Sequence, residues 1–239
     1  MTDVVILDQL RVAFLVAIMI GASYLDLRTR EISDKIWYIA LGGGALLNLV
    51  QLTLDFSSRF LLLLLSSLLI AGIIGFGIYY LGLFGGADAK AMLSIGMILP
   101  LYQPMVGIHP FAPVMVFSNG IILSLLPIIF LLFYNLSRIV RGHAIYSGFE
   151  SEKSWRKALA LIVGYRTRSS GGKFLLSIES VVDSKKSFDF SPAKAGDDFV
   201  ETSETWVTPG IPLLVFITAG LLLMLAYGDL TSLLFLNFI

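Results

Sequence analysis

The sequence predicts an all-α membrane protein with six transmembrane helices and a small cytoplasmic α+β insertion between the fifth and sixth helices. Two observations support this fold class. Hydrophobic residues make up 56% of the 239 residues and charged residues only 14%, with a mean hydropathy of +0.85, which is more apolar surface than one soluble core buries. The apolar residues are also concentrated in six windows, five before and one after the polar stretch 137–206.

Each window approaches the length that a membrane crossing needs, because a bilayer core of about 30 Å requires roughly 20 apolar helical residues. The first window is interrupted in its outer turns by Asp8 and Arg11. The fourth is short and contains Pro100 and Pro104, so we expect it to cross with little tilt or to end in an irregular segment. The six windows are Val4–Leu25, Ile36–Leu54, Phe60–Leu83, Ala89–Val106, Ala112–Leu136 and Val207–Tyr227.

The distribution of basic residues predicts the orientation. With six spans, Arg11 and Arg59 fall on one side, and the other 15 of the 17 Lys and Arg residues fall on the opposite side. Because short loops rich in Lys and Arg remain in the cytoplasm, we assign Asp26–Lys35, Leu83–Lys90 and Ser137–Trp206 to the cytoplasmic face of a multi-pass plasma-membrane protein. Seventeen acidic residues balance the basic ones, so charge indicates no nucleic-acid partner.

The predicted domain organisation places residues 1–136 in the first five spans, 137–206 in a cytoplasmic insertion and 207–239 in the last span and a tail. Within the insertion, Trp155–Gly164 is expected to be a helix lying on headgroups or against the bundle, with Trp155, Leu159 and Ile162 on one face. Phe174–Val182 is expected to be a strand and Ser191–Glu204 an acidic linker.

The residue types exclude several chemistries. The chain has no cysteine, which removes disulfides, thiolate metal sites and cysteine nucleophiles. His109 and His143 have no partners at metal-ligand spacing, so we give both structural roles and expect neither a metal nor a cofactor.

Two carboxylates at the expected cytoplasmic face are the candidate functional groups, because a charge inside a span is costly and charges at its edges are therefore the first to examine for function. Asp26 ends the first span and Asp88 precedes the fourth. Each also has a simpler explanation: Asp88 as an N-cap after a glycine turn, and Asp26 as a solvated or ion-paired group beside Arg28 and Arg30. We expect the two arginines at lipid headgroups and Lys90 directed away from the carboxylates.

The sequences around these aspartates resemble a known family. The segments Asp26–Trp37 and Gly85-Gly86-Ala87-Asp88 are similar to those of archaeal preflagellin (archaellin) and prepilin signal peptidases, which are Gly-x-Gly-Asp membrane aspartic proteases related to type IV prepilin peptidases. The entry to the last span, Glu204–Leu213, is also similar to that of the preflagellin peptidases. One departure is Ala87, which replaces the second glycine of the motif and disfavours positive φ.

The resemblance implies that Asp26 and Asp88 are catalytic. Peptide hydrolysis by two aspartates needs one ionised carboxylate to activate water and one protonated carboxyl to polarise the scissile carbonyl. Because Asp88 lies at a helix N-terminus, where the anion is favoured, we expect it to be the base and Asp26 its partner. Five neighbours are candidates for substrate binding, by backbone approach or by pairing with basic residues: Gly85, Gly86, Ala87, Glu31 and Asp34.

The leading functional hypothesis is therefore a membrane aspartic endopeptidase that cleaves class III signal peptides of archaellin or pilin precursors at the cytoplasmic face. Its expected partners are the membrane-inserted precursor and the lipid bilayer; the oligomeric state is open. The alternative is a proton-coupled transporter with Asp26 and Asp88 as relay groups, although transporters usually place such groups near the bilayer midplane and within repeated halves.

Overall fold

The computed structural model describes residues 2–82, 85–167, 174–182, 185–190, 204–210 and 212–236. The chain divides into two compact units, which we describe separately. Unit 1 contains Met1–Leu123 and Pro212–Ile239, and unit 2 contains Ser124–Ile211. One helix, α5 (Ala112–Val140), has residues in both units.

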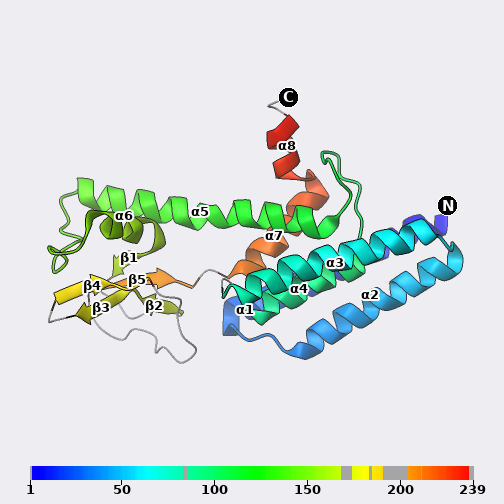
Figure 1. Ribbon diagram of the computed structural model, residues 1–239, viewed down its shortest axis with the longest axis horizontal. Coiled ribbons are helices and arrows are strands. Elements are labelled where there is room, and N and C mark those ends of the chain that lie inside the picture. Colours follow the sequence, from blue (N-terminus) through cyan, green and yellow to red (C-terminus); the bar gives the residue numbers. More distant parts are fainter. Residues whose placement is uncertain are drawn as a thin grey trace. The chain divides into compact units, whose positions relative to one another are not determined.

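Unit 1 is a bundle of apolar helices. Helices α1 (Thr2–Thr29), α2 (Asp34–Leu54), α3 (Ser58–Tyr80) and α4 (Gly86–Ile98) run side by side (Figure 1). The start of α5 and the two last helices, α7 (Leu213–Ala226) and α8 (Leu230–Leu236), complete the unit. Its buried core is formed by aliphatic and methionine side chains from α1, α4, α5 and α7, together with Trp37 and Ala40 of α2.

Four helices are long and apolar enough to cross a membrane: Val5–Thr29, Asp34–Leu54, Ser58–Gly77 and Ala112–Val140. The predictions for the first, second, third and fifth windows are therefore confirmed as apolar helices of membrane-spanning length. Helices α4 and α7 have 13 and 14 residues, which corresponds to about 20 Å each. The expected irregular end of the fourth window is confirmed, since α4 stops at Ile98, two residues before Pro100.

The predicted start of the last window was wrong. Val207 does not begin a helix but lies in strand β5 (Thr205–Pro209) with its side chain buried, and α7 begins only after Pro212. The reason is that Val207 pairs with Tyr165 and Ser177 in a sheet. The apolar residues of β5 are followed closely in the sequence by those of α7, so hydropathy alone does not show where the strand ends and the helix begins.

Small residues bring α3 and α4 into close contact. A Cβ atom at Gly75 of α3 would lie 2.9 Å from the carbonyl oxygen of Ala89. On α4, a Cβ atom at Gly96 would lie 2.8 Å from the Cβ of Ala71. Helices in lipid associate largely by such close packing, so these residues fix α4 against α3 without intervening side chains.

Arg11 connects three helices. Its side chain is 1% exposed, and Nη1 donates to Asn48 Oδ1 at 2.7 Å and to the Ile98 carbonyl at 2.8 Å. Nη2 donates to Gln51 Oε1 at 2.8 Å and to the Leu47 carbonyl at 3.2 Å. The charge of Arg11 is therefore buried inside the bundle, where polar groups of α2 and α4 accept hydrogen bonds from Nη1 and Nη2.

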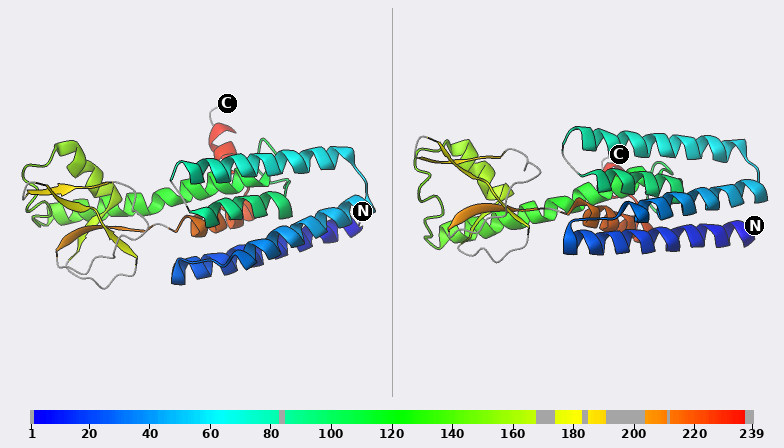
Figure 2. Two further views of the ribbon diagram at one scale, coloured as in Figure 1. Left: turned by 60° about the horizontal axis from the view of Figure 1, so that its bottom comes forward. Right: turned by 90° about the horizontal axis from the view of Figure 1, so that it is seen from below.

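Unit 2 is a small α+β module, as predicted for the insertion. Its sheet has the antiparallel order β1 (Tyr165–Thr167), β5, β2 (Leu175–Ser177). A hairpin of β3 (Glu179–Val182) and β4 (Lys185–Phe188) adjoins it, and the predicted strand over Phe174–Val182 is thus two strands separated at Ile178 (Figure 2).

The core of unit 2 is aromatic. Phe149 stacks on Phe188 with ring centroids 4.2 Å apart, and Trp206 packs edge-on against Phe188 at 5.4 Å. The predicted helix is confirmed as α6 (Ser154–Val163), which contributes Ala160 to this core, whereas Trp155 is 61% exposed. The expected acidic linker, apart from Glu204, lies outside the described residues.

Candidate active site

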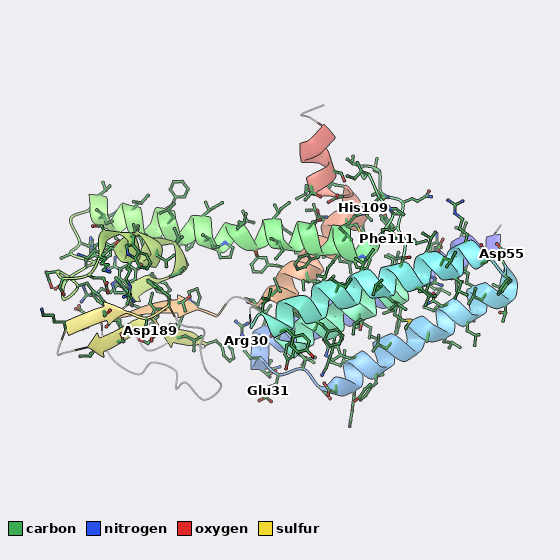
Figure 3. All side chains as sticks on the ribbon, viewed as in Figure 1. Arg30, Glu31, Asp55, His109, Phe111 and Asp189 are labelled. Carbon is green, nitrogen blue, oxygen red and sulfur yellow. The ribbon has the colours of Figure 1, made fainter. Side chains whose placement is uncertain are left out.

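The two candidate aspartates lie at the same end of the unit 1 bundle. Asp26 is in the last turn of α1, and Asp88 is in the first turn of α4. Figure 3 labels Arg30 and Glu31 at this end, and Asp55, which follows α2, at the other. The fold thus brings together two carboxylates that are 62 positions apart in sequence.

The local structure around Asp88 differs from a simple N-cap. The N-cap of α4 is Gly85, and Asp88 is the third residue of the helix. The Gly85 amide donates to Asp88 Oδ2 at 3.0 Å, and the Asp88 amide donates to the Gly85 carbonyl at 3.2 Å. This reciprocal pairing fixes the Asp88 side chain against the first turn of the helix.

Alanine fits the helix at the altered motif position. Ala87 is the second residue of α4 and has ordinary helical geometry. Among the described residues other than glycine, positive φ occurs at Arg30, Phe174 and Glu204. A left-handed conformation is therefore not required of Ala87, and the departure from the glycine motif introduces no backbone strain.

The carboxyl of Asp88, which precedes the expected fourth span, has a strongly altered acidity. Burial raises its pKa to about 6, while the hydrogen bond from the Gly85 amide lowers it. Two further groups act on it: the charge of Asp26 raises the pKa of Asp88, and the charge of Arg30 lowers it. Asp26, Asp88 and Arg30 consequently share one electrostatic environment.

Arg30 faces this environment rather than only the headgroups. Its Nη1 lies 4.0 Å from Asp26 Oδ2, its amide donates to the Asp26 carbonyl at 3.1 Å, and its φ is +59° where α1 ends. Arg28, in contrast, donates from Nη1 to Tyr24 Oη at 3.0 Å. The four-residue spacing from Asp26 to Arg30 is the sequence signal that indicates this ion pair.

The other predicted binding residues occupy the rim of the site. Lys90 donates from Nζ to Asp34 Oδ1 at 2.5 Å, so it pairs with Asp34 rather than with Asp26 or Asp88, and Asp34 already has a cationic partner. Glu31 is exposed (Figure 3). Gly85 is also exposed, whereas Gly86 is half-buried.

A small cavity adjoins Asp88. Its volume of about 10 Å³ is close to the space that one water molecule occupies. It lies among α3, α4, α5 and α7, and it is lined by Gly75, Gly85, Asp88, Ala89, Met92, Phe117, Leu213 and Ile217. This space is much too small for a peptide, whereas Gly85, whose amide binds Asp88, is exposed.

Helix α7 also holds the end of α1. Ser23, three residues before Asp26, lies 2.6 Å from Thr218 by their hydroxyl oxygens. The Ser23 hydroxyl also donates to the Leu214 carbonyl at 3.3 Å, and the Thr218 hydroxyl donates to the Met19 carbonyl at 3.3 Å. Sequence reasoning did not identify these residues, because a serine and a threonine 195 positions apart carry no local signal.

Within the part of the chain that the structure describes, no group of three or more His, Cys, Asp or Glu residues is arranged to hold a metal ion. At this end of the bundle, the Asp26 and Asp88 carboxylates share the Arg30 guanidinium as a neighbouring charge.

Comparison with known proteins places this arrangement in context. Residues 13–136 match the model of the type IV leader peptidase family, and residues 193–230 match the archaeal peptidase A24 C-terminal region of type II. The chain is 32% identical over 232 residues to a preflagellin peptidase of Methanococcus voltae, covering 87% of this chain and 91% of that relative.

Two further relatives have the same printed name. The preflagellin peptidase of Methanococcus maripaludis is 28% identical over 224 residues, covering 88% of this chain and 92% of its own length. That of Methanocaldococcus jannaschii is 28% identical over 230 residues, with 87% and 89% covered. Similarity therefore extends over both units.

Proposed function

The chain belongs to the type IV leader peptidase family and is a membrane peptidase, and we propose that it cleaves signal peptides of archaellin or pilin precursors with Asp26 and Asp88 as catalytic groups. One observation carries the assignment: two carboxylates far apart in sequence act on each other at the end of the bundle, where burial raises the pKa of Asp88 to about 6. Such an altered acidity in a carboxylate pair is typical of acid–base catalysis.

The pair performs hydrolysis with one proton. The ionised carboxylate accepts a proton from water as the water oxygen attacks the carbonyl carbon, while the protonated carboxyl donates its proton to the carbonyl oxygen. The tetrahedral intermediate then collapses: its C–N bond breaks, the leaving nitrogen takes a proton from a carboxyl, and the second carboxyl regains the proton of the hydroxyl group. The dyad ends with one proton, as it began.

We assign that resting proton to Asp88, the reverse of the assignment from helix position. The helix N-terminus and the Gly85 amide favour the anion of Asp88, but burial outweighs them and raises its pKa to about 6. Asp26, beside the Arg30 guanidinium at 4.0 Å, is then the ionised base.

Substrate contacts follow from what lies exposed around the dyad. Gly85 is exposed and Gly86 and Ala87 are half-buried; because these residues are small, an extended peptide can pass close to Asp88. Glu31 is exposed and free to meet a basic leader residue, and Asp34 can do so by exchanging its Lys90 partner.

We further propose six membrane crossings, with the dyad and residues 137–206 on the cytoplasmic side of the plasma membrane. Helices α4 and α7 span only about 20 Å each, so the segments that follow them complete the crossing. Asp229 supports this for α7: it is buried and accepts hydrogen bonds from the Ser118, Thr231 and Ser232 hydroxyls, so the turn into α8 carries no unsatisfied charge.

The test is cleavage of a purified preflagellin by the full-length enzyme in detergent. Asp26→Asn and Asp88→Asn keep the side-chain size but remove titration, and each is expected to lower the rate by at least about 10³-fold. Asp55→Asn is the matched control, because Asp55 is exposed at the opposite end of the bundle. Full activity of Asp88→Asn would refute the mechanism.

A further inference from the structure

Unit 2 contains a polar cavity that the proposed peptidase reaction does not use. Its volume is about 380 Å³, and it is lined by Arg138, His143, Ala144, Ser147, Arg166, Thr167 and Glu204. Two guanidinium groups, an imidazole and two hydroxyl groups therefore face one carboxylate. A cavity of this size with convergent polar groups has the dimensions of a small-ligand site.

Both guanidinium groups are held in place by the backbone. Arg166 Nη1 donates to the Ala144 and Ile145 carbonyls at 3.1 and 3.2 Å, and its side chain is 12% exposed. Arg138 Nη1 donates to the Arg166 carbonyl at 2.5 Å. Because these contacts fix the two side chains before any ligand arrives, little rotamer entropy remains to be lost on binding.

The cavity retains positive charge and donors. Glu204 lies 3.6 Å from Arg166 Nη2 and is 46% exposed, so one solvated carboxylate faces two guanidinium groups. Planar guanidinium groups bind phosphate through paired N–H donors, and the Ser147 hydroxyl adds a further donor.

The position of Arg138 on α5 relates the cavity to the membrane surface. Helix α5 has 29 residues, or about 43 Å, which exceeds a hydrocarbon core of about 30 Å. Arg138 lies in its last turn, whereas Phe130 and Phe133 are 68% and 66% exposed one to two turns earlier, as lipid-facing residues are. The residues around Arg138 therefore correspond to the headgroup layer.

An aromatic pair supports the same depth. Tyr134 and Tyr165 pack edge to face with ring centroids 6.0 Å apart, and the Arg138 guanidinium lies 5.9 Å from the centre of the Tyr134 ring. Tyrosine is enriched where the hydrocarbon meets the headgroups. Arg138 and Tyr134 thus lie where a lipid phosphate lies.

We propose that this cavity binds the phosphate group of an anionic membrane lipid, a function that goes beyond peptide cleavage. The phosphate replaces Glu204 as the partner of Arg166 and engages Arg138, while the acyl chains run along the exposed apolar side of α5. Anionic lipid would then anchor unit 2 at the membrane surface.

The test is lipid binding by the full-length protein in detergent, measured by native mass spectrometry with phosphatidylglycerol and with phosphatidylcholine of the same chain length. We expect phosphatidylglycerol to bind about tenfold more tightly. Arg138→Gln and Arg166→Gln are each expected to weaken its binding about tenfold. Arg141→Gln is the matched control, since Arg141 is exposed just after α5 and does not line the cavity, and it should change binding less than about twofold.

A second variant does not depend on removing a structural arginine. Glu204→Gln removes the competing carboxylate and is expected to tighten phosphatidylglycerol binding about threefold. Equal effects of Arg138→Gln and Arg141→Gln, equal binding of the two lipids, or weaker binding by Glu204→Gln would each overturn the proposal. If inorganic phosphate alone bound as tightly as the lipid, the phosphate site would stand but its assignment to a lipid would be overturned.

Discussion

Arg30 offers a quantitative test of how Asp26 and Asp88 share a proton, because its positive charge acts on both carboxyl groups. If Asp88 holds the single proton, kcat/KM falls when Asp88 ionises, so the wild-type pH profile should have an alkaline limb near pH 6, the value to which burial raises the pKa of Asp88. The Arg30 charge lowers that pKa. Replacing Arg30 with glutamine should therefore raise the pKa of Asp88 and move the alkaline limb to higher pH.

The Arg30–Asp26 ion pair sets an upper limit for the effect of Arg30 on Asp88. At the 4.0 Å separation of Arg30 Nη1 and Asp26 Oδ2, two unit charges interact by about 1 kcal/mol in water and about 4 kcal/mol at an effective dielectric constant of 20. Arg30 has the smallest of the four influences on Asp88, and its side chain is 27% exposed and thus partly screened. We expect the limb to move upward by about half to one pH unit, or about 0.7 to 1.4 kcal/mol.

The assay is the initial rate of preflagellin cleavage at substrate concentrations well below KM, from about pH 4 to about pH 9. Arg28→Gln is the matched control: it removes the same charge two residues away, where Arg28 binds Tyr24 instead of the dyad, and its alkaline limb should stay in place. A limb that is unchanged or lower in Arg30→Gln would refute the assignment of the proton to Asp88.

Three further sets of substitutions test the packing that supports the site. Gly75→Ala places a Cβ atom 2.9 Å from the backbone of α4 and should destabilise the fold by about 1–3 kcal/mol in thermal unfolding, whereas Gly77→Ala, with no atom within 4 Å, should not. Ser23→Ala and Thr218→Val should each lower stability by about 1 kcal/mol, and the double variant should lower it by less than the sum. Arg11→Gln should lower the unfolding temperature, because acceptors on α2 and α4 lose their donor and the shorter amide cannot replace it. An unchanged unfolding temperature would show that Arg11 does not hold these helices together.

The sequence predicted the elements whose causes are local. An apolar window of sufficient length sets each long helix, Pro100 ends α4, and the polar composition of the insertion excludes it from lipid. Asp26 and Asp88 could be placed at one end of the bundle because the direction of each helix follows from counting spans. The sequence therefore predicted where Asp26 and Asp88 lie along the bundle, but not their burial or their contacts.

Long-range contacts could not be predicted in this way. Nothing in the sequence near Arg11 indicates that Asn48 and Gln51 satisfy it, because these residues are neighbours only after α1 and α2 pack. Hydropathy likewise placed Val207 in a span, since it does not distinguish a side chain buried in a sheet from one that faces lipid. The pKa of Asp88 also depends more on burial by other helices, which raises it, than on the Gly85 amide at the helix terminus, which lowers it.

The hydrogen bonds of Arg11 fix α1 against α2 and α4 at a point far from Asp26. The helix is pinned there to α2 and α4, and Asp26 lies 15 residues farther along, at the end of an arm of about 22 Å. A swing of about 5° around that pivot displaces the Asp26 carboxylate by about 2 Å. The Ser23–Thr218 contact lies close to Asp26, three residues before it on α1. Because the Ser23–Thr218 contact lies near Asp26, it restricts the separation of Asp26 and Asp88 more strongly than the same contact would if it lay beside Arg11.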